Sequence, residues 1–300
     1  MGMYCIRRVL LAIPVIAGVT ILVFFVIHLV PGDPVQMMLG DNASTADIEE
    51  LRTALGLNDP LPLQFKNFIV SIFDGNLGRS IMTRRPVMES IRERIPSTIM
   101  LAFGALAVAL TIAVPIGTIS AWKRNSAIDG ISRIISLLGI SVPNFWLGPM
   151  LIIIFYIKLS LFSISGIMLP AITLGAGMAA ITTRMIRSTL IDVMAENYVT
   201  TAKSKGLSNA VIMIKHALKN ALLPVVTIVG LQFGALLSGA IIVETIFSWP
   251  GIGMLTIEAI TRRDYPMVQG CILVISCCYV FINLLTDIAY GILDPRIRYD

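Results

Sequence analysis

The amino-acid sequence predicts an all-α polytopic membrane protein with six transmembrane helices, and three observations carry that prediction. Hydrophobic residues make up 56% of the chain and charged residues only 14%, whereas soluble domains are about 25% charged. Six apolar stretches reach the roughly 20 residues that a helix needs to cross a bilayer. Lys and Arg residues stand at the ends of those stretches rather than in one patch, which argues for lipid and against nucleic acid as the main partner.

The six predicted spans are residues 9–30, 97–121, 132–157, 168–190, 223–247 and 268–292. The first follows Arg7 and Arg8 and is too long for the core of a signal peptide, so we expect it to be retained as a membrane helix. Near the end of the fourth span, Arg184 and Arg187 are expected to snorkel outward as the helix leaves the bilayer.

The positions of Lys and Arg also predict orientation. With the N-terminus in the cytoplasm, the short outside loops hold only Lys158, Arg262 and Arg263, so both termini are expected inside. The chain then divides into a stub and first span at 1–30, an external helical cap at 31–96, and a five-helix core at 97–300 with a cytoplasmic loop at about 191–222. In the cap we expect helices at 44–51 and 60–73, and a third from Pro86 into the second span.

Motifs of the common enzyme classes are missing from the sequence. It contains no G-x-x-x-x-G-K-[ST] phosphate loop, no G-x-S-x-G, no H-E-x-x-H and no paired carboxylates within the spans. We therefore predict no catalytic residue and no metal site, and we interpret the four cysteines as small hydrophobic residues. A transporter subunit, a channel or ion-coupled carrier, and a membrane scaffold remain. A carrier would need ionisable residues deep in the spans, where this chain has almost none.

A polar segment between the fourth and fifth spans is the best sequence clue to mechanism. Residues 198–205 can form about two turns of helix, and Gly206 can take the left-handed conformation that ends one. Lys203 and Lys205 lie near its C-terminal end, where cations favour the helix dipole, and the small Ala202 would let a partner surface approach closely. We call residues 198–206 the knob and predict that it inserts into a groove on a soluble partner; the alternative is an ordinary solvated loop.

An ordered series of motifs along nearly the whole chain resembles the inner-membrane permease subunits of binding-protein-dependent ABC importers, in the dipeptide/oligopeptide/nickel family. The motifs are Leu29-Val30-Pro31-Gly32-Asp33-Pro34, Leu55-Gly56-Leu57-Asn58-Asp59-Pro60-Leu61, Gly75-Asn76-Leu77-Gly78-Arg79-Ser80, Arg85-Pro86-Val87, Ser141-Val142-Pro143-Asn144-Phe145-Trp146, residues 200–207, Phe247-Ser248-Trp249-Pro250-Gly251-Ile252-Gly253, Arg263-Asp264-Tyr265-Pro266 and Asp294-Pro295-Arg296.

The resemblance implies the type I importer permease fold and a role for the knob in coupling to ATPase subunits. The family signature Glu-Ala-Ala-x-x-x-Gly, aligned on Gly206, falls on Thr200, Thr201 and Ala202; Thr in place of the acid is common in the peptide branch. The coupling residues that follow are Tyr198, Thr200, Thr201, Ala202, Lys203, Lys205 and Gly206.

The implied partners are a second homologous permease, two ATPase subunits that carry ATP and magnesium, and a periplasmic or lipid-anchored binding protein above the cap. This chain itself is expected to bind no cofactor. The implied location is the bacterial inner membrane, and the implied cargo is a di- or oligopeptide, with nickel or a metal chelate, or glutathione, as alternatives. The outside loop at about 158–168 is shorter than relatives usually carry, so no docking contacts are transferred to it.

Four polar or helix-breaking residues in the spans are candidates for the translocation path. Pro143 removes a backbone hydrogen bond from the third span, so Pro143 and Asn144 are either a pore-lining hinge or a packing kink. Gln232 lies among small residues that favour close helix packing, and packing is preferred there to a substrate contact. Glu244, near the outer end of the fifth span, is either a gate or a buried helix–helix hydrogen bond.

Overall fold

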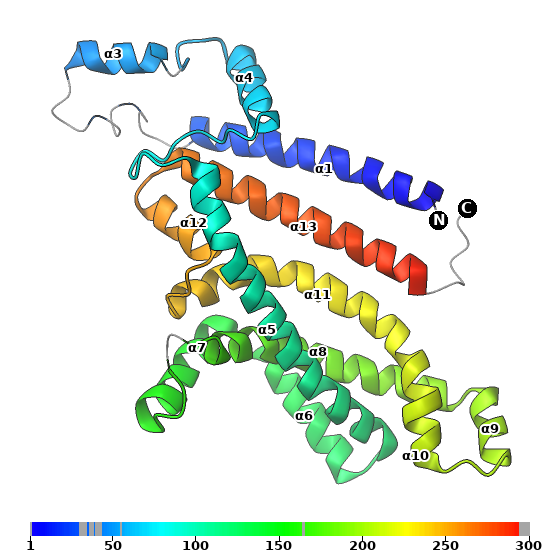
Figure 1. The fold of residues 1–300 in the computed structure, drawn as a ribbon. Helices are drawn as coiled ribbons and strands as arrows, with labels where there is room; N and C mark the ends of the chain where they lie inside the picture. The colour runs from blue at the N-terminus through cyan, green and yellow to red at the C-terminus, as the bar shows by residue number, and fades with distance from the viewer. Residues whose placement is uncertain are drawn as a thin grey trace.

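The computed structural model describes residues 2–29, 35, 39, 44–54, 56–163 and 166–293, and across these ranges the chain is helical with no β-strand (Figure 1). Residues 30–34 and 294–296, which carry parts of the first and last matching motifs, lie outside the described residues. Both ends of the described chain lie on one side of the molecule, beside the ends of α1 and α13 (Figure 1).

Within the part of the chain that the structure describes, four helices are long and apolar enough to cross a membrane by themselves. These are α1 (Gly2–Leu29), α5 (Val87–Trp122), α8 (Met168–Met194) and α13 (Tyr265–Leu293). Two further bent helix pairs bring the number to six if each pair is one span. The predicted continuation of the cap helix into the second span is confirmed, because α5 runs unbroken through 36 residues.

The third predicted span is broken rather than kinked. It consists of α6 (Ala127–Ser141), α7 (Asn144–Leu151) and the π-helical segment η1 (Ile152–Lys158), with a bend of 104° between the two halves. Val142 is extended, with φ −82° and ψ 117°, as expected for a residue before proline. Pro143 starts the second half, where its missing N–H costs nothing.

The fifth predicted span begins earlier in the chain than the sequence suggests. The short α10 (Asn209–Val211) and the π-helical η2 (Ile212–Ala217) lead directly into α11 (Leu218–Ile246). The parts before and after Leu223 differ in direction by 50°, and Pro224 begins the second part. A short helix, α12 (Ile252–Thr261), then returns to α13.

Small residues let the central helices α5 and α8 pack closely. Ala105 and Ala109 of α5 are fully buried in the largest apolar cluster, and a Cβ on Gly175 of α8 would lie 2.7 Å from the Ala105 carbonyl oxygen. Such close backbone contact is typical of membrane helices, where packing rather than water drives association. The α5–α8 pair is therefore the centre of the core.

Helix α1 lies along α13 at the edge of this core (Figure 1). The Gln269 Nε2 group donates to the Val23 carbonyl oxygen at 2.9 Å, and Arg8 pairs with Asp287 at 2.8 Å. The two contacts join the helices at opposite ends.

The two short cap helices predicted from the sequence are confirmed as α3 (Thr45–Ala54) and α4 (Leu61–Phe73). Phe24 of α1 contacts Phe65 of α4, with ring centroids 5.2 Å apart. The loop before α5 is tied to the turn before α13, because the Asp264 carboxylate accepts from the Ser80 hydroxyl and the Ile81 N–H. At the start of α5, hydrogen bonds to Glu93 and Glu89 raise the pKa of Arg85 above its ordinary value.

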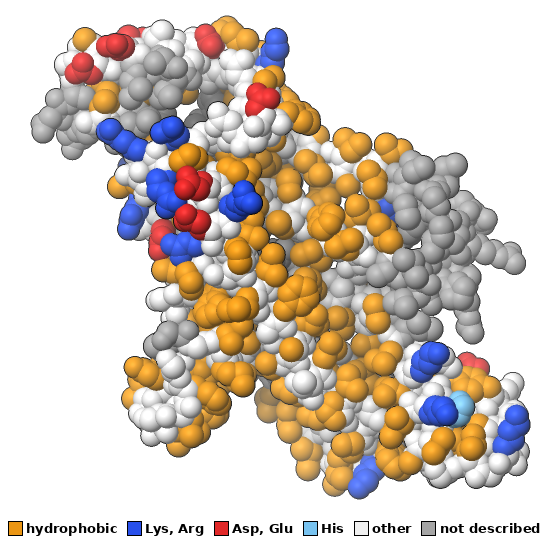
Figure 2. Space-filling view, in the orientation of Figure 1, with side chains coloured by type: hydrophobic (Ala, Val, Ile, Leu, Met, Phe, Trp, Pro, Cys, Tyr) orange, Lys and Arg blue, Asp and Glu red, His pale blue; other side chains and the backbone are white. Residues whose placement is uncertain are grey.

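Charged side chains on the visible face gather at two places (Figure 2). One lies over the cap and the start of α5, and the other over α10 and its preceding helix α9 (Asn197–Ser204). The surface between them is broadly hydrophobic, as expected for helices that face lipid.

Candidate functional site

The knob is a short helix held between two membrane segments. Its helical part is α9, which follows α8 after a two-residue turn and precedes α10 by four residues. The Ala195 N–H bonds the Asp192 carbonyl, and the Glu196 N–H bonds the Val193 carbonyl. The predicted helix over residues 198–205 is confirmed to within one residue at each end.

Gly206 ends α9 in the left-handed conformation that the sequence predicts, with φ +79°. Its N–H donates to the Lys203 carbonyl at 2.9 Å, and the Leu207 N–H donates to the Ala202 carbonyl at 3.4 Å. These two bonds form a Schellman motif, which satisfies carbonyls that the helix itself leaves free. A Cβ on Gly206 would meet nothing within 4 Å, so the requirement for glycine is conformational rather than steric.

The inner face of α9 is apolar and anchors the knob. Val199 and Ala202 pack with Ile212 of η2 and with Met194 of α8. Ala202 is therefore buried within the chain, where its small side chain makes room for Ile212. The Asn220 amide of α11 donates to the Tyr198 hydroxyl at 2.9 Å, which adds a polar bond between α9 and α11.

The outer face of α9 is exposed and polar. It presents the remaining candidate coupling residues, which are Tyr198, Thr200, Thr201, Lys203 and Lys205, with Gly206 at the end. Because this exposed helix is attached to two membrane segments, a partner that displaces it would displace both of them.

A buried ion pair lies where α5, α6 and α8 meet, at the end of α8 that leads to the knob. The Asp129 carboxylate is fully buried, and Arg187 donates to both of its oxygens, Nε at 2.5 Å and Nη2 at 2.8 Å. The Ser120 hydroxyl and the Asn125 N–H also donate to it, at 2.6 and 3.0 Å. Arg184 is exposed as expected, but Arg187 does not snorkel outward as predicted: it turns inward because this carboxylate offers two acceptors.

The sequence contains a local signal for this cluster, at the start of α6. Ser126 is the N-cap of α6 and accepts from the Asp129 N–H. A Ser followed three residues later by an acid is a known helix-start pattern, and it places the carboxylate at the end of the helix rather than in mid-span.

Glu244 is part of a second buried polar cluster, at the far end of α11. Its carboxylate accepts from the Thr98 hydroxyl of α5 at 2.7 Å and from the Met254 N–H in the first turn of α12 at 3.0 Å. The Ile252 N–H donates to Thr98 Oγ1 at 2.9 Å. Trp249 is buried beside this cluster, and its indole donates to the Ser97 carbonyl at 2.9 Å.

Two glycines make this cluster possible. A Cβ on Gly251 would lie 2.2 Å from Glu244 Oε1, and one on Gly253 would lie 2.6 Å from Ile241 Cα. Only residues without a side chain allow the α11–α12 turn to fold over the carboxylate. The Trp249-Pro250-Gly251-Ile252-Gly253 motif thus builds a cap over Glu244, and this side chain does not face an open path in this conformation.

The other path candidates lie apart from Glu244. The Gln232 amide of α11 bonds the Thr182 hydroxyl of α8 at 3.3 Å, which fits a packing role. Pro143 is exposed at the break between α6 and α7, and Asn144 is partly exposed there. Among the described residues, no group forms a hydrogen bond with the Asn144 side chain.

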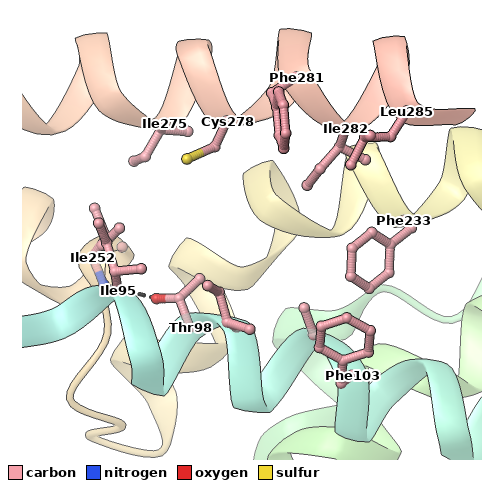
Figure 3. Close-up of a pocket in the computed structure, with 13 residues that line it drawn as sticks. Ile95, Thr98, Phe103, Phe233, Ile252, Ile275, Cys278, Phe281, Ile282 and Leu285 are labelled. Carbon is pink, nitrogen blue, oxygen red and sulfur yellow. Dashed lines mark hydrogen bonds between the residues drawn. The ribbon is translucent and has the colours of Figure 1, made fainter. Parts of the chain in front are cut away.

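An apolar cavity of about 260 Å³ lies between α5, α11 and α13 beside the Glu244 cluster (Figure 3). Phe103, Phe233 and Phe281 face into it, and Thr98 contributes a hydroxyl that the Ile252 N–H already occupies. Such a lining suits a hydrophobic group and offers no charge to recognise a peptide terminus.

Comparison with known proteins identifies the family. The family described as "Binding-protein-dependent transport system inner membrane component" matches residues 113–299, and its N-terminal counterpart matches residues 1–102. The chain is 42% identical to the dipeptide transport system permease protein DppB of Alkalihalophilus pseudofirmus, over 99% of both chains. It is also 42% identical to the glutathione transport system permease protein GsiC of Pectobacterium atrosepticum, again over 99% of both.

A solved structure of the MetNI methionine ABC transporter, in an inward-facing conformation, shows the same fold. Its chain superposes with a TM-score of 0.58 at 16% identity, covering 69% of this chain and 97% of that one. At this identity the likeness concerns the fold alone, which is that of type I importer permeases. The chain therefore belongs to the family of binding-protein-dependent transport system inner-membrane components, the permease subunits of ABC importers.

Proposed function

We propose that this chain forms half of the translocation path of a peptide importer. A second, homologous permease forms the other half, two ATPase subunits bind on the knob side, and a substrate-binding protein docks above the cap. ATP and magnesium belong to the ATPase subunits. Both termini and the knob lie in the cytoplasm, as the distribution of Lys and Arg favours.

The observation that carries this proposal is the attachment of the knob. Its inner face packs on η2, Tyr198 bonds Asn220 of α11, and α8 enters it directly. When ATP closes the ATPase pair, a displacement of α9 would move α8 and α11 together. Closure would then favour the outward-open state that receives cargo, because ATP would bind better to the complex in that state than in the inward-open one.

Named relatives support a peptide cargo. One carries dipeptides, another glutathione, and a third, 39% identical, is a probable D,D-dipeptide permease of Escherichia coli K12. Glutathione is itself a tripeptide, so these cargoes share amide and carboxylate chemistry. We therefore prefer di- or oligopeptides to nickel or a metal chelate, with glutathione as the second candidate.

Asn144 is the path candidate that the structure leaves available. Glu244 and Gln232 are bonded to neighbouring helices, whereas the side chain of Asn144, beside the Pro143 break, has no hydrogen bond to the described residues. We propose that this break faces the second permease, where an amide could contact peptide cargo.

Co-purification from mild detergent tests the proposal. The tagged chain is expressed with its ATPase and binding-protein genes, as wild type, Gly206→Trp and Gly75→Trp. Gly75 is a matched control, since it also has a positive φ (+70°) and open space around it, but lies in the cap. ATPase subunits should accompany wild type and Gly75→Trp, and Gly206→Trp should lose them or hydrolyse ATP without transport.

Two results would count against the importer reading. If ATPase recovery and coupling are the same for both tryptophan variants, the knob does not grip the ATPase. If the reconstituted chain transports peptide without any ATPase, the ion-coupled carrier or channel reading replaces the proposal.

A further inference from the structure

A second cavity, of about 310 Å³, lies beneath the knob, between the end of α5, the end of α8 and the start of α10. We propose that it binds a phosphate group, presented by the headgroup of an anionic phospholipid. The proposal rests on the cations that line the cavity, on its position at the end of a membrane helix and on the apolar residues that line the rest of it.

The lining is basic. Arg124, from the α5–α6 turn, and Lys203, from α9, both line this cavity although they are far apart in sequence. Among the described residues no carboxylate pairs with either cation, and no acidic side chain lines the cavity. Two like charges at one cavity without a paired carboxylate create a positive potential that an anion would relieve. Asn209, at the start of α10, lines the same cavity and is polar.

The cavity lies at the level where lipid headgroups are found. Trp122, at the last position of the membrane helix α5, lines it and is half exposed, and tryptophan at a span end marks the headgroup region. Basic pockets between membrane helices on the cytoplasmic side suit anionic lipid headgroups.

The floor favours an amphipathic ligand over a free ion. Ile191 and Met194 of α8 and Met213 of η2 contribute apolar surface beside the two cations. A glycerophosphate group has a charged phosphate and an apolar attachment to its chains, and this combination matches the lining. A free phosphate would leave the apolar part of the cavity unmatched.

The two lysines of the knob differ in their position relative to the cavity. Lys203 lines the cavity, whereas Lys205, two residues later and also exposed, does not. The same holds for Arg124 and its neighbour Lys123. Each cation in the cavity therefore has a matched control within two residues of it in the chain.

Native mass spectrometry of the full chain in mild detergent tests the proposal, with phosphatidylglycerol as the probe and phosphatidylcholine as the zwitterionic comparison. Arg124→Gln and Lys203→Gln should each weaken phosphatidylglycerol binding about fivefold, from the usual contribution of one cation near an anionic lipid. The double variant should weaken it about 25-fold. Lys123→Gln and Lys205→Gln should stay within about twofold of wild type, since neither lines the cavity.

Several outcomes would overturn the proposal. Equal losses in the cavity variants and in their neighbours would mean a diffuse charge effect, and no loss in the double variant would mean that lipid binds elsewhere. Displacement of the lipid by inorganic phosphate at equal concentration would assign the site to a free anion. Thermal unfolding without added lipid checks that the variants are folded; if Arg124→Gln does not fold, Lys203→Gln against Lys205→Gln decides alone.

Discussion

Removing the Asp129 carboxylate should destabilise the chain strongly, because this group is the common acceptor of three segments. Breaking a buried ion pair by deleting one partner costs about 3–5 kcal/mol, mainly because the other charge loses its compensation. Arg187 is 20% exposed, so it can turn partly toward water, and we expect the lower value, about 3 kcal/mol, for Asp129→Ala. With about 2–4 °C per kcal/mol for a chain of this class, the thermal midpoint should fall by about 6–12 °C.

Thermal unfolding in one detergent, followed by tryptophan fluorescence, measures this shift. Arg133→Gln is the control: Arg133 lies 3.9 Å from the same carboxylate but its side chain is 58% exposed, so its loss should cost less than about 1 kcal/mol. The double variant Asp129→Leu/Arg187→Leu should recover at least half of the loss, because apolar packing can replace a buried pair. A midpoint for Asp129→Ala within 2 °C of wild type, or a double variant no better than the single one, would refute the reasoning.

Three further predictions concern two close contacts and the orientation of the chain. Gly251→Ala should lower the free energy of unfolding by about 1–3 kcal/mol, because the added methyl group overpacks the site. Gly130→Ala, in an open helical position, should be neutral or stabilising. Thermal unfolding of the two variants checks both, and equal midpoints would contradict the overpacking argument. Ser80→Ala removes a donor from a buried carboxylate and should cost about 1–3 kcal/mol, measured by denaturant unfolding; an unchanged midpoint would show that this bond adds nothing. In a cysteine-free background, a membrane-impermeant maleimide should label Asn76→Cys but not Ser204→Cys in cells with a permeable outer membrane, and the reverse pattern would invert the proposed orientation.

Elements with strong local signals could be predicted from the sequence. The spans at 97–121 and 168–190 have long apolar stretches, and α5 and α8 contain them. The end of α9 could be predicted because a glycine, which readily takes the left-handed conformation, follows a helical segment with lysines in its last turn. In each of these cases neighbours in the chain determine the structure.

Features that depend on distant residues could not be predicted in the same way. The inward turn of Arg187 requires Asp129, 58 residues away, and the burial of Ala202 requires Ile212 on another segment. A proline before Asn144 predicts an interruption but not the bend of 104° between the two halves, both of which contact α8, a helix that begins later in the chain. Sequence spacing carries no information on these contacts.

The three buried carboxylates described here have one physical reason for their positions. Asp129, Glu244 and Asp264 each accept a backbone N–H at a turn or in the first turn of a helix: from Asn125, Met254 and Met267 respectively. The first N–H groups of a helix have no partner within it and carry the positive end of its dipole.

In an apolar environment such donors need an acceptor, because water is absent. A carboxylate supplies two oxygens, so it can accept further hydrogen bonds beside the one from the backbone. In each case here a side chain from a second element also donates to it: Arg187, Thr98 and Ser80. An acid near the end of a membrane span therefore joins two helices as readily as it lines a path. For Glu244 the positions of Gly251 and Gly253, which make room for its bonds, favour the joining role, and the search for cargo contacts is better directed at Asn144 and the α6–α7 break.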